Sequence, residues 1–276
     1  MRALVDGDII PYEFGGMVQL EDPEQPLQWE ILRSMVDDRV SQILEASGAT
    51  EYSMYLTDSA SNFRINVATI VPYKGKRKTE KPAQWAAIRQ HLIDNWNAEV
   101  IYGMEADDKL GIEQCKAVAE DMECGEQASE DVYNYNTILC SRDKDLHMIP
   151  GWHYSWPAGK QPERLWFQDE TSAIRCFYRQ LLTGDTTDNI LCLYGVGAKS
   201  KLCAKLEDLD QESLMFEVVY TAYKDRFGAY AAQFMSENAA LLWMLREEPI
   251  KNNPAQEAYN RLEMELLAME ANNEQL

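Results

Sequence analysis

The segment "SRDKDLHMIPG" (141–151) places Asp143 and Asp145 two residues apart, directly after the apolar run "NTILC". Side chains two apart on an extended chain share a face, so these two carboxylates are predicted to lie about 6–7 Å apart. Like charges at that separation repel each other unless a metal ion, a lysine or a proton lies between them. The spacing therefore predicts that one of these three neutralises the pair.

Acidic residues also follow the other apolar runs that we expect to be strands. Asp6 follows "RALV", Asp58 follows "MYLT", and "EADD" follows "VIYG". The segment "GDTTDN" adds two aspartates three residues apart, a spacing that would put both on one side of a helical turn. Ligands of open α/β sheets bind beyond the carboxyl ends of the strands, so these acids are predicted to converge. The nine candidates are Asp6, Asp58, Glu105, Asp107, Asp108, Asp143, Asp145, Asp185 and Asp188.

A single aspartate after a strand is most often a turn former or a helix N-cap. Five groups of acids on one rim are harder to explain in that way, because their charge has to be neutralised. Oxygen-only ligation favours hard divalent ions, Mg²⁺ or Mn²⁺, over zinc. We therefore interpret the acids as a site for two metal ions, which at about 3.5–4 Å apart clamp the attacking and leaving oxygens of a displacement at phosphorus. The predicted chemistry is phosphodiester hydrolysis.

Two basic segments are candidates for contacts with phosphate. "YKGKRKTEK" (73–81) includes Lys74 and Arg77 and reads either as a solvated basic loop or as a phosphate clamp over the metal site. "YGVGAKSK" (194–201) is either an ordinary turn between two helices or a segment that binds the backbone of a duplex. In the second reading, its glycines let backbone amides approach a phosphate, while Lys199 and Lys201 add charge.

Composition limits the alternatives. The chain has 276 residues and a formal net charge of −20. This charge argues against a protein that coats nucleic acid without specificity, unless metal ions neutralise the clustered acids. Six cysteines and three histidines show no zinc-binding spacing. We see no secretory signal and no run of about 20 apolar residues. We expect a soluble cytoplasmic protein without a membrane segment.

The elements that must position these residues alternate along the first two-thirds of the chain. Strands are expected at 2–6, 52–57, 99–103 and 136–140, and helices near 28–46, 82–97 and 106–122. This alternation predicts a mostly parallel sheet with helices on both faces. After about residue 170 the pattern is helical, and the last helix, from Pro254, has apolar residues at a helical period that should dock on the body. We expect domains at 1–180 and 181–276.

The motifs together resemble a known family. "VDGD", "TDSASNFR", "YKGKR", "EADD", "SRDKD" and "GDTTDNI…GVGAK" stand in the order and approximate spacing of the structure-specific 5′ nucleases, the flap endonuclease superfamily. "TDS…FR" and "SRDKD…IP" are most similar to the bacteriophage 5′–3′ exonucleases. The resemblance covers roughly residues 2–205. It implies a PIN-like α/β nuclease core, a basic arch over residues 62–97, and a helix-3-turn-helix motif that binds duplex DNA with the help of a monovalent cation such as K⁺.

The resemblance also implies roles for individual residues. Asp6, Asp58, Glu105 and Asp107 would serve one ion, Asp143, Asp145, Asp185 and Asp188 the second, with Asp108 near both. Lys74 and Arg77 would contact the scissile phosphate as catalytic residues. DNA contacts are expected from Arg64, Tyr73, Lys76, Gly195, Gly197, Lys199 and Lys201. Asp8 is an additional acid without a match, and a helix N-cap is its simplest role.

The expected function is a monomeric, two-metal 5′–3′ exonuclease with flap endonuclease and RNase H-like activity. Its substrates would be double-stranded, nicked or flap DNA and RNA–DNA hybrids, in phage-type DNA replication or degradation alongside replication proteins. One alternative is a PIN-type ribonuclease, which needs the acids but not "GVGAK". Another is a catalytically silent DNA-binding module, which would be expected to have lost several carboxylates.

Overall fold

The computed structural model describes residues 1–58, 60–76, 80–123, 136–251 and 253–274. The chain divides into two compact units, one made of Met1–Ser61, Thr79–Leu146 and Gly151–Gln168 and the other of Asn62–Lys78, His147–Pro150 and Asp169–Leu276. This division differs from the expected 1–180 and 181–276. The segment that carries Lys74 belongs to the second unit, although the sequence around it suggested an arch inserted in the first.

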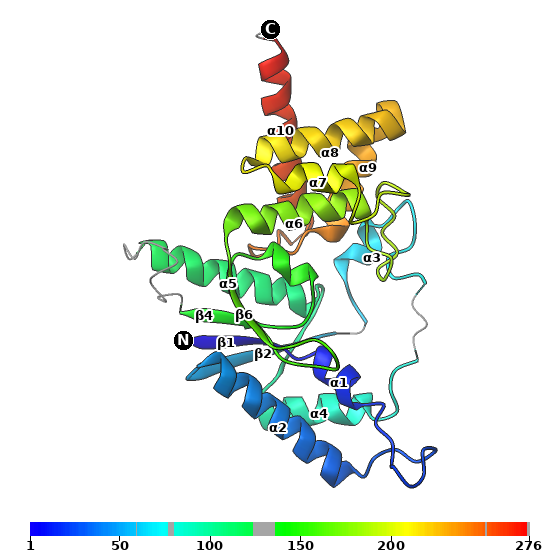
Figure 1. The fold of residues 1–276 in the computed structure, drawn as a ribbon, viewed down its shortest axis with the longest axis vertical. Helices are drawn as coiled ribbons and strands as arrows, with labels where there is room; N and C mark the ends of the chain where they lie inside the picture. Colours follow the sequence, from blue (N-terminus) through cyan, green and yellow to red (C-terminus); the bar gives the residue numbers. More distant parts are fainter. Residues whose placement is uncertain (59, 77–79, 124–135, 252, 275–276) are drawn as a thin grey trace. The chain divides into compact units, whose positions relative to one another are not determined.

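The first unit contains a six-stranded sheet (Figure 1). Its strands are β1 (Arg2–Asp6), β2 (Glu51–Thr57), β3 (Glu99–Ile101), β4 (Thr137–Cys140), β5 (Gly151–Ser155) and β6 (Arg164–Gln168). The strand order is β3-β2-β1-β4-β5-β6, and each neighbouring pair is parallel except β5 and β6. The predicted α/β class with a mostly parallel sheet is confirmed. Strands β5 and β6 were not predicted.

Helices cover both faces of this sheet. One face is covered by α1 (Ile9–Phe14), α2 (Trp29–Ser47) and α4 (Trp85–Trp96), and the other by α5 (Ala106–Glu123) (Figure 1). Helix α2 forms because Leu32, Val36, Val40 and Ile43 recur three or four residues apart, and all four are fully buried against the sheet. The three helices expected at 28–46, 82–97 and 106–122 are confirmed, whereas the short α1 was not predicted.

The second unit is helical. It contains α3 (Phe63–Val67), α6 (Glu170–Thr183), α7 (Lys201–Glu207), α8 (Glu212–Phe227), the 3₁₀ turn η2 (Gly228–Tyr230), α9 (Ala231–Leu242) and α10 (Gln256–Glu274). Phe177 of α6 is fully buried edge-on against Trp243. The last helix docks on the unit as predicted, because Leu262 of α10 is buried and α10 contacts both α8 and α9.

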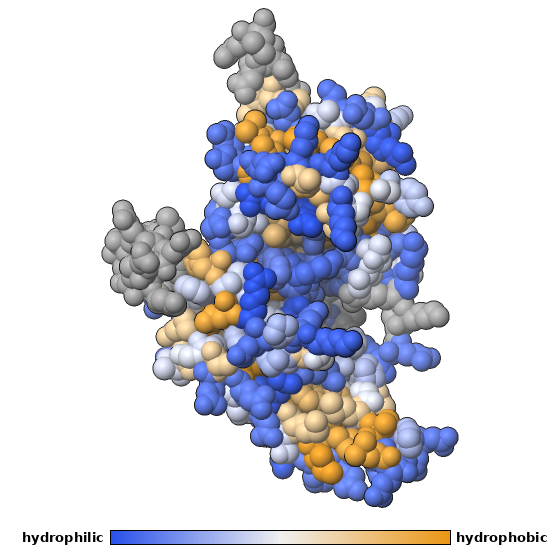
Figure 2. Space-filling view, in the orientation of Figure 1, coloured by the Kyte–Doolittle hydropathy of each residue, from blue (hydrophilic) through white to orange (hydrophobic). Residues whose placement is uncertain are grey.

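The net charge of −20 predicts a largely hydrophilic surface. Figure 2 shows hydrophilic side chains over most of the face in view. In the first unit, exposed apolar side chains include Tyr12, Val18, Leu20 and Ile31. None of the described helices is both long and apolar enough to cross a membrane.

Candidate active site

The carboxyl ends of β1 and β4 form the starting point of the site in the first unit. Strands β2 and β3 lie on one side of β1 and β4 lies on the other, so the order of the chain reverses between β1 and β4. Ligands of open α/β sheets bind at such a switch point. Asp6 ends β1 and Ser141 directly follows β4, and the Ser141 hydroxyl donates to the Asp6 carboxylate at 2.7 Å.

Asp6 is held in place from both sides. Its other carboxylate oxygen accepts the backbone N–H of Asp8 at 3.1 Å. Gly7 makes this turn possible, because a Cβ there would lie 2.8 Å from the carbonyl oxygen of Tyr55. Burial raises the pKa of Asp6 to about 7, with a further increase from the charges of Asp8 and Asp143, while the hydrogen bond from Ser141 acts in the opposite direction. The ionised form of Asp6 is therefore unfavourable in the folded protein, and binding of a proton or a cation would stabilise it.

The N-terminus of α5 brings further acids to the same region. The N–H of Ala106 donates to the Thr57 hydroxyl at 2.8 Å, which ties the helix to the end of β2. Asp108, which is fully buried, accepts the N–H of Glu105 at 3.1 Å and so caps the first turn. A helix N-terminus carries partial positive charge, which favours acids in this turn.

The pKa of Asp107 is shifted in the same direction as that of Asp6. Burial raises the pKa of Asp107 well above its usual value, followed by the charges of Asp6, Asp143, Glu105 and Asp8 in that order. Acids from three strand ends, those of β1, β3 and β4, thus act on one another electrostatically. Asp6, Glu105, Asp107 and Asp143 make up the carboxylate cluster of the first unit.

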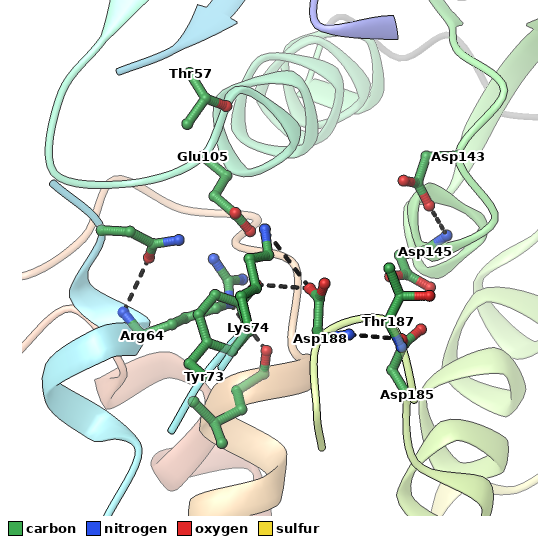
Figure 3. Close-up of polar contacts among 12 residues, drawn as sticks. Thr57, Arg64, Tyr73, Lys74, Glu105, Asp143, Asp145, Asp185, Thr187 and Asp188 are labelled. Atoms are coloured by element: carbon green, nitrogen blue, oxygen red, sulfur yellow. Dashed lines mark hydrogen bonds and ion pairs between the residues drawn. The ribbon is translucent and has the colours of Figure 1, made fainter. Parts of the chain in front are cut away.

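The pair Asp143 and Asp145 does not have the predicted extended geometry. The chain leaves the sheet after Cys140, and Asp145 begins the 3₁₀ turn η1 (Asp145–Met148). The N–H of Asp145 donates to the Asp143 carboxylate at 2.8 Å (Figure 3), and Lys144 lies 3.7 Å from the Asp145 carboxylate. The premise that both side chains share a strand face is therefore wrong. Asp143 caps the turn, while its charge acts on Asp6 and Asp107.

Two other acids of the first unit have local partners. Asp58 accepts the hydroxyl of Ser61 at 3.1 Å at the end of β2. Asp8 stands at the N-cap position of α1, as expected, but its side chain makes no cap hydrogen bond. Its carboxylate instead accepts the N–H of Thr57 at 2.9 Å and pairs with Arg89 of α4 at 3.2 Å. Asp8 thereby links β1, β2 and α4.

In the second unit, Asp185 and Asp188 lie in a turn rather than on a helix. Asp185 pairs with Ile190 as an isolated bridge, and its carboxylate accepts the N–H groups of Thr187 and Asp188 at 2.7 and 3.0 Å (Figure 3). The helical-turn spacing predicted for this pair is wrong. Asp185 is buried and shapes the loop that presents Asp188.

Asp188 contacts Tyr73, which was predicted to contact DNA, and Lys74, which was predicted to contact the scissile phosphate. Its carboxylate accepts the Tyr73 hydroxyl at 2.8 Å and lies 3.7 Å from the Lys74 ammonium (Figure 3). The Lys74 backbone has a φ of 55°, in the left-handed region, and its N–H donates to the Asp188 carbonyl at 2.8 Å. Asn189 adds a hydrogen bond to the carbonyl of Pro72 at 2.9 Å. The structure thus brings Tyr73, Lys74 and Asp188 together.

Arg64 lies in the interior of the second unit. It is fully buried, donates to the carbonyls of Leu241 and Trp243 at 2.9 and 2.6 Å, and lies over the Phe63 ring. This placement differs from the expected DNA contact, because the guanidinium has no exposed surface. Lys76 is exposed, and Arg77 lies outside the described residues.

The "GVGAK" segment forms an exposed turn before α7. Gly195 has a φ of 88°, which only glycine adopts without strain. No atom lies within 4 Å of the position that a Cβ would take at Gly195 or at Gly197. Ser200 caps α7 by accepting the N–H of Cys203. Lys199 is exposed on this turn, and Lys201, which is also exposed, begins α7. The helix-3-turn-helix assignment stays a prediction.

The carboxylate cluster fits a hard divalent cation in its chemistry. Its members offer oxygen atoms only, and their mutual repulsion favours a cation. Within the part of the chain that the structure describes, no three Asp, Glu, His or Cys side chains are already arranged to hold a metal ion. The donors are therefore suitable in type and charge, without a preformed coordination shell.

The fold is that of a bacteriophage 5′-exonuclease, as the motifs predicted. A structure of the T5 5′-exonuclease with bound divalent metal ions (zinc) matches with 16% identity and a TM-score of 0.50, covering 88% of this chain and 100% of that one. Two further T5 structures cover 87% of this chain and 98% of their own. One is a protein co-crystallised with metal ions (16% identity, TM-score 0.49), the other a flap endonuclease complex with DNA and metal ions (15%, 0.48). No family model and no curated protein matches this chain.

Proposed function

We propose that this chain is a divalent-metal-dependent 5′ nuclease of DNA. The observation that carries the proposal is the carboxylate cluster at the switch point of the sheet, where burial raises the pKa of Asp6 to about 7 and that of Asp107 well above its usual value. Perturbed carboxylates at a ligand-binding edge are typical of functional sites. The fold of a 5′-exonuclease supports the same reaction class.

Asp6, Glu105, Asp107 and Asp143 would hold the ions in the first unit. Two such ions, when bound, stabilise the charge on the attacking and leaving oxygens of phosphodiester hydrolysis. Ser141 orients Asp6 through its hydrogen bond, and Thr57 fixes the first turn of α5, on which Asp107 lies. In the second unit, Lys74 would stabilise negative charge that develops on the phosphate. Mg²⁺ or Mn²⁺ is the proposed metal.

The finer activities remain part of the proposal. They include 5′–3′ exonuclease, flap endonuclease and RNase H-like cleavage, action on nicked DNA and hybrids, and a role in phage-type replication as a cytoplasmic monomer. Lys199, Lys201 and the amides around Gly195 and Gly197 would contact the duplex backbone, with K⁺ at the turn. The exposure of the two lysines at this turn and at the start of α7 supports this role.

Comparing two substrates tests the proposal against a PIN-type ribonuclease. With Mg²⁺, the protein should cleave a DNA duplex with a 5′ flap and leave single-stranded RNA of the same sequence largely intact. Asp107→Asn is the matched inactive control. Preferential cleavage of the RNA would favour the ribonuclease, and duplex binding without cleavage in Mg²⁺ or Mn²⁺ would favour the silent DNA-binding module.

A further inference from the structure

The segment 62–75 of the second unit is attached to helices that follow it by more than a hundred residues. At its start, Arg64 of α3 donates to the carbonyls of Leu241 and Trp243 at the end of α9. This buried guanidinium fixes α3 on α9. No function was predicted for α9, so its contacts with this segment raise the question of what the helix does.

Glu237 of α9 makes the next attachment. One of its carboxylate oxygens accepts the backbone N–H groups of both Thr69 and Ile70 at 2.8 Å, and the other accepts the Thr69 hydroxyl. Glu237 is 9% exposed. A carboxylate is costly to bury unless it is hydrogen-bonded, and bonds from N–H groups to a charged acceptor are stronger than neutral ones. This side chain therefore sets the position of the backbone at 69–70.

The segment is attached again only two residues further on. Asn189 donates to the Pro72 carbonyl, and the Lys74 N–H donates to the Asp188 carbonyl. Val71 alone separates the residues bound by Glu237 from Pro72. A shift of the backbone at 69–70 therefore displaces Tyr73 and Lys74, because so short a connection cannot absorb it.

We propose that Glu237 is a positioning residue for the nuclease reaction. It holds Thr69 and Ile70 so that Lys74 keeps its place beside Asp188, which gives α9 a role in catalysis without contact with the substrate. The inference rests on the proposed function, because Lys74 is assigned to the phosphate there. Misplacement of a catalytic group by about 1 Å can cost about 100-fold in rate.

Hydrogen exchange tests the attachment without any catalysis. Glu237→Ala should speed amide exchange across 69–75, and Glu237→Gln, which retains an acceptor oxygen, should restore most of the protection. The matched control is Asn238→Ala on the same helix. Asn238 is buried and donates to the Tyr223 hydroxyl, so its loss weakens α9 without touching the segment. Exchange at 69–75 that is equal in the Glu237→Ala and Asn238→Ala proteins would reject the attachment.

Single-turnover cleavage of a flap duplex tests the catalytic consequence. Glu237→Ala should slow cleavage by about 10–100-fold while duplex binding stays within about twofold. In a Lys74→Ala background the same change should slow cleavage by less than about twofold, because Glu237 acts through Lys74. An equal loss in both backgrounds would overturn the positioning role. Thr69→Ala, which removes only the hydroxyl contact, provides a milder variant if Glu237→Ala does not fold.

The two readouts separate the inference from the function on which it rests. If the unmutated protein cleaves no DNA, the proposed function fails and the catalytic role of Glu237 fails with it. If the unmutated protein cleaves but the Glu237 variants behave like Asn238→Ala in both assays, only the positioning role is rejected.

Discussion

The ammonium group of Lys74 lies 3.7 Å from the carboxylate of Asp188, and the Lys74 N–H donates to the carbonyl oxygen of the same residue at 2.8 Å. The sequence predicted different roles for these two residues, a phosphate contact for Lys74 and a metal ligand for Asp188. In this structure each neutralises the other. A phosphate approaching Lys74, or a cation approaching Asp188, would therefore have to compete with this ion pair.

Lys74→Ala should reduce single-turnover cleavage by about 10²–10³-fold, the usual cost of removing one group that stabilises transition-state charge. Duplex binding should change little, because the contact strengthens in the transition state. The exposed neighbour Lys76 provides the control, since Lys76→Ala should reduce binding rather than the rate of the bound complex. A loss confined to affinity in the Lys74→Ala protein would reject the catalytic assignment.

Asp107→Asn should raise the melting temperature of the metal-free protein. Burial and four neighbouring acids destabilise the ionised carboxylate, and the uncharged amide removes that repulsion. A gain of about 1 kcal/mol corresponds to about 2–4 °C for a domain of 150–250 residues. Mg²⁺ should stabilise the unmutated protein by binding its folded state, and the variant should lose most of this response. Calorimetric scans in EDTA and in Mg²⁺ measure both effects.

The stability of the metal-free protein should depend on pH through Asp6. Its pKa is raised from 3.8 to about 7 on folding, chiefly by burial, so the folded state holds the proton more tightly. The stabilisation by protonated Asp6 is therefore complete below about pH 4 and disappears as the pH rises to about 7. Urea unfolding in EDTA measures this effect. As the pH rises through this window, the free energy of unfolding of the unmutated protein should fall relative to that of the Asp6→Asn protein. A constant difference between the two proteins would show that Asp6 keeps an ordinary pKa.

Lys199→Ala combined with Lys201→Ala should weaken binding to all duplex sequences alike. Contacts to phosphates carry no sequence information, and each one lost lowers the slope of log K against log salt by about 0.9 for a duplex. Binding titrations at several salt concentrations give both quantities. Unchanged affinity and slope would leave the "GVGAK" turn with a structural role only.

The strong periodic features of the chain were predictable from the sequence. Helix α2 has an apolar stripe from Leu32 to Ile43. At the carboxyl edge, β1 ends in an aspartate, β2 is followed by an aspartate and β4 is followed by a serine. Strands β5 and β6 were missed because "GWHYS" and "RLWFQ" are short and mix polar with aromatic residues. Such runs look like irregular chain until a neighbouring strand pairs with them.

The site was less predictable where it depends on contacts between distant residues. The interior position of Arg64 requires carbonyl groups 177 and 179 residues away, and no local pattern around "FR" indicates them. Likewise, no local pattern indicates the hydrogen bond from the Thr69 N–H to the Glu237 carboxylate, because the two residues are 168 positions apart. The geometry of Asp143 and Asp145 was misread because the strand ends at Cys140, and an aspartate two residues before a 3₁₀ turn can cap it.

The reaction proposed for this chain is metal-dependent cleavage from the 5′ side of a DNA end. The most direct measurement follows one flap duplex labelled at the 5′ end and, separately, at the 3′ end, with Mg²⁺ and with EDTA. We predict short 5′-labelled products, a 3′-labelled strand that is shortened only from its 5′ side, and no cleavage in EDTA. Sequential loss from the 3′ end, or cleavage that persists in EDTA, would rule out this reaction.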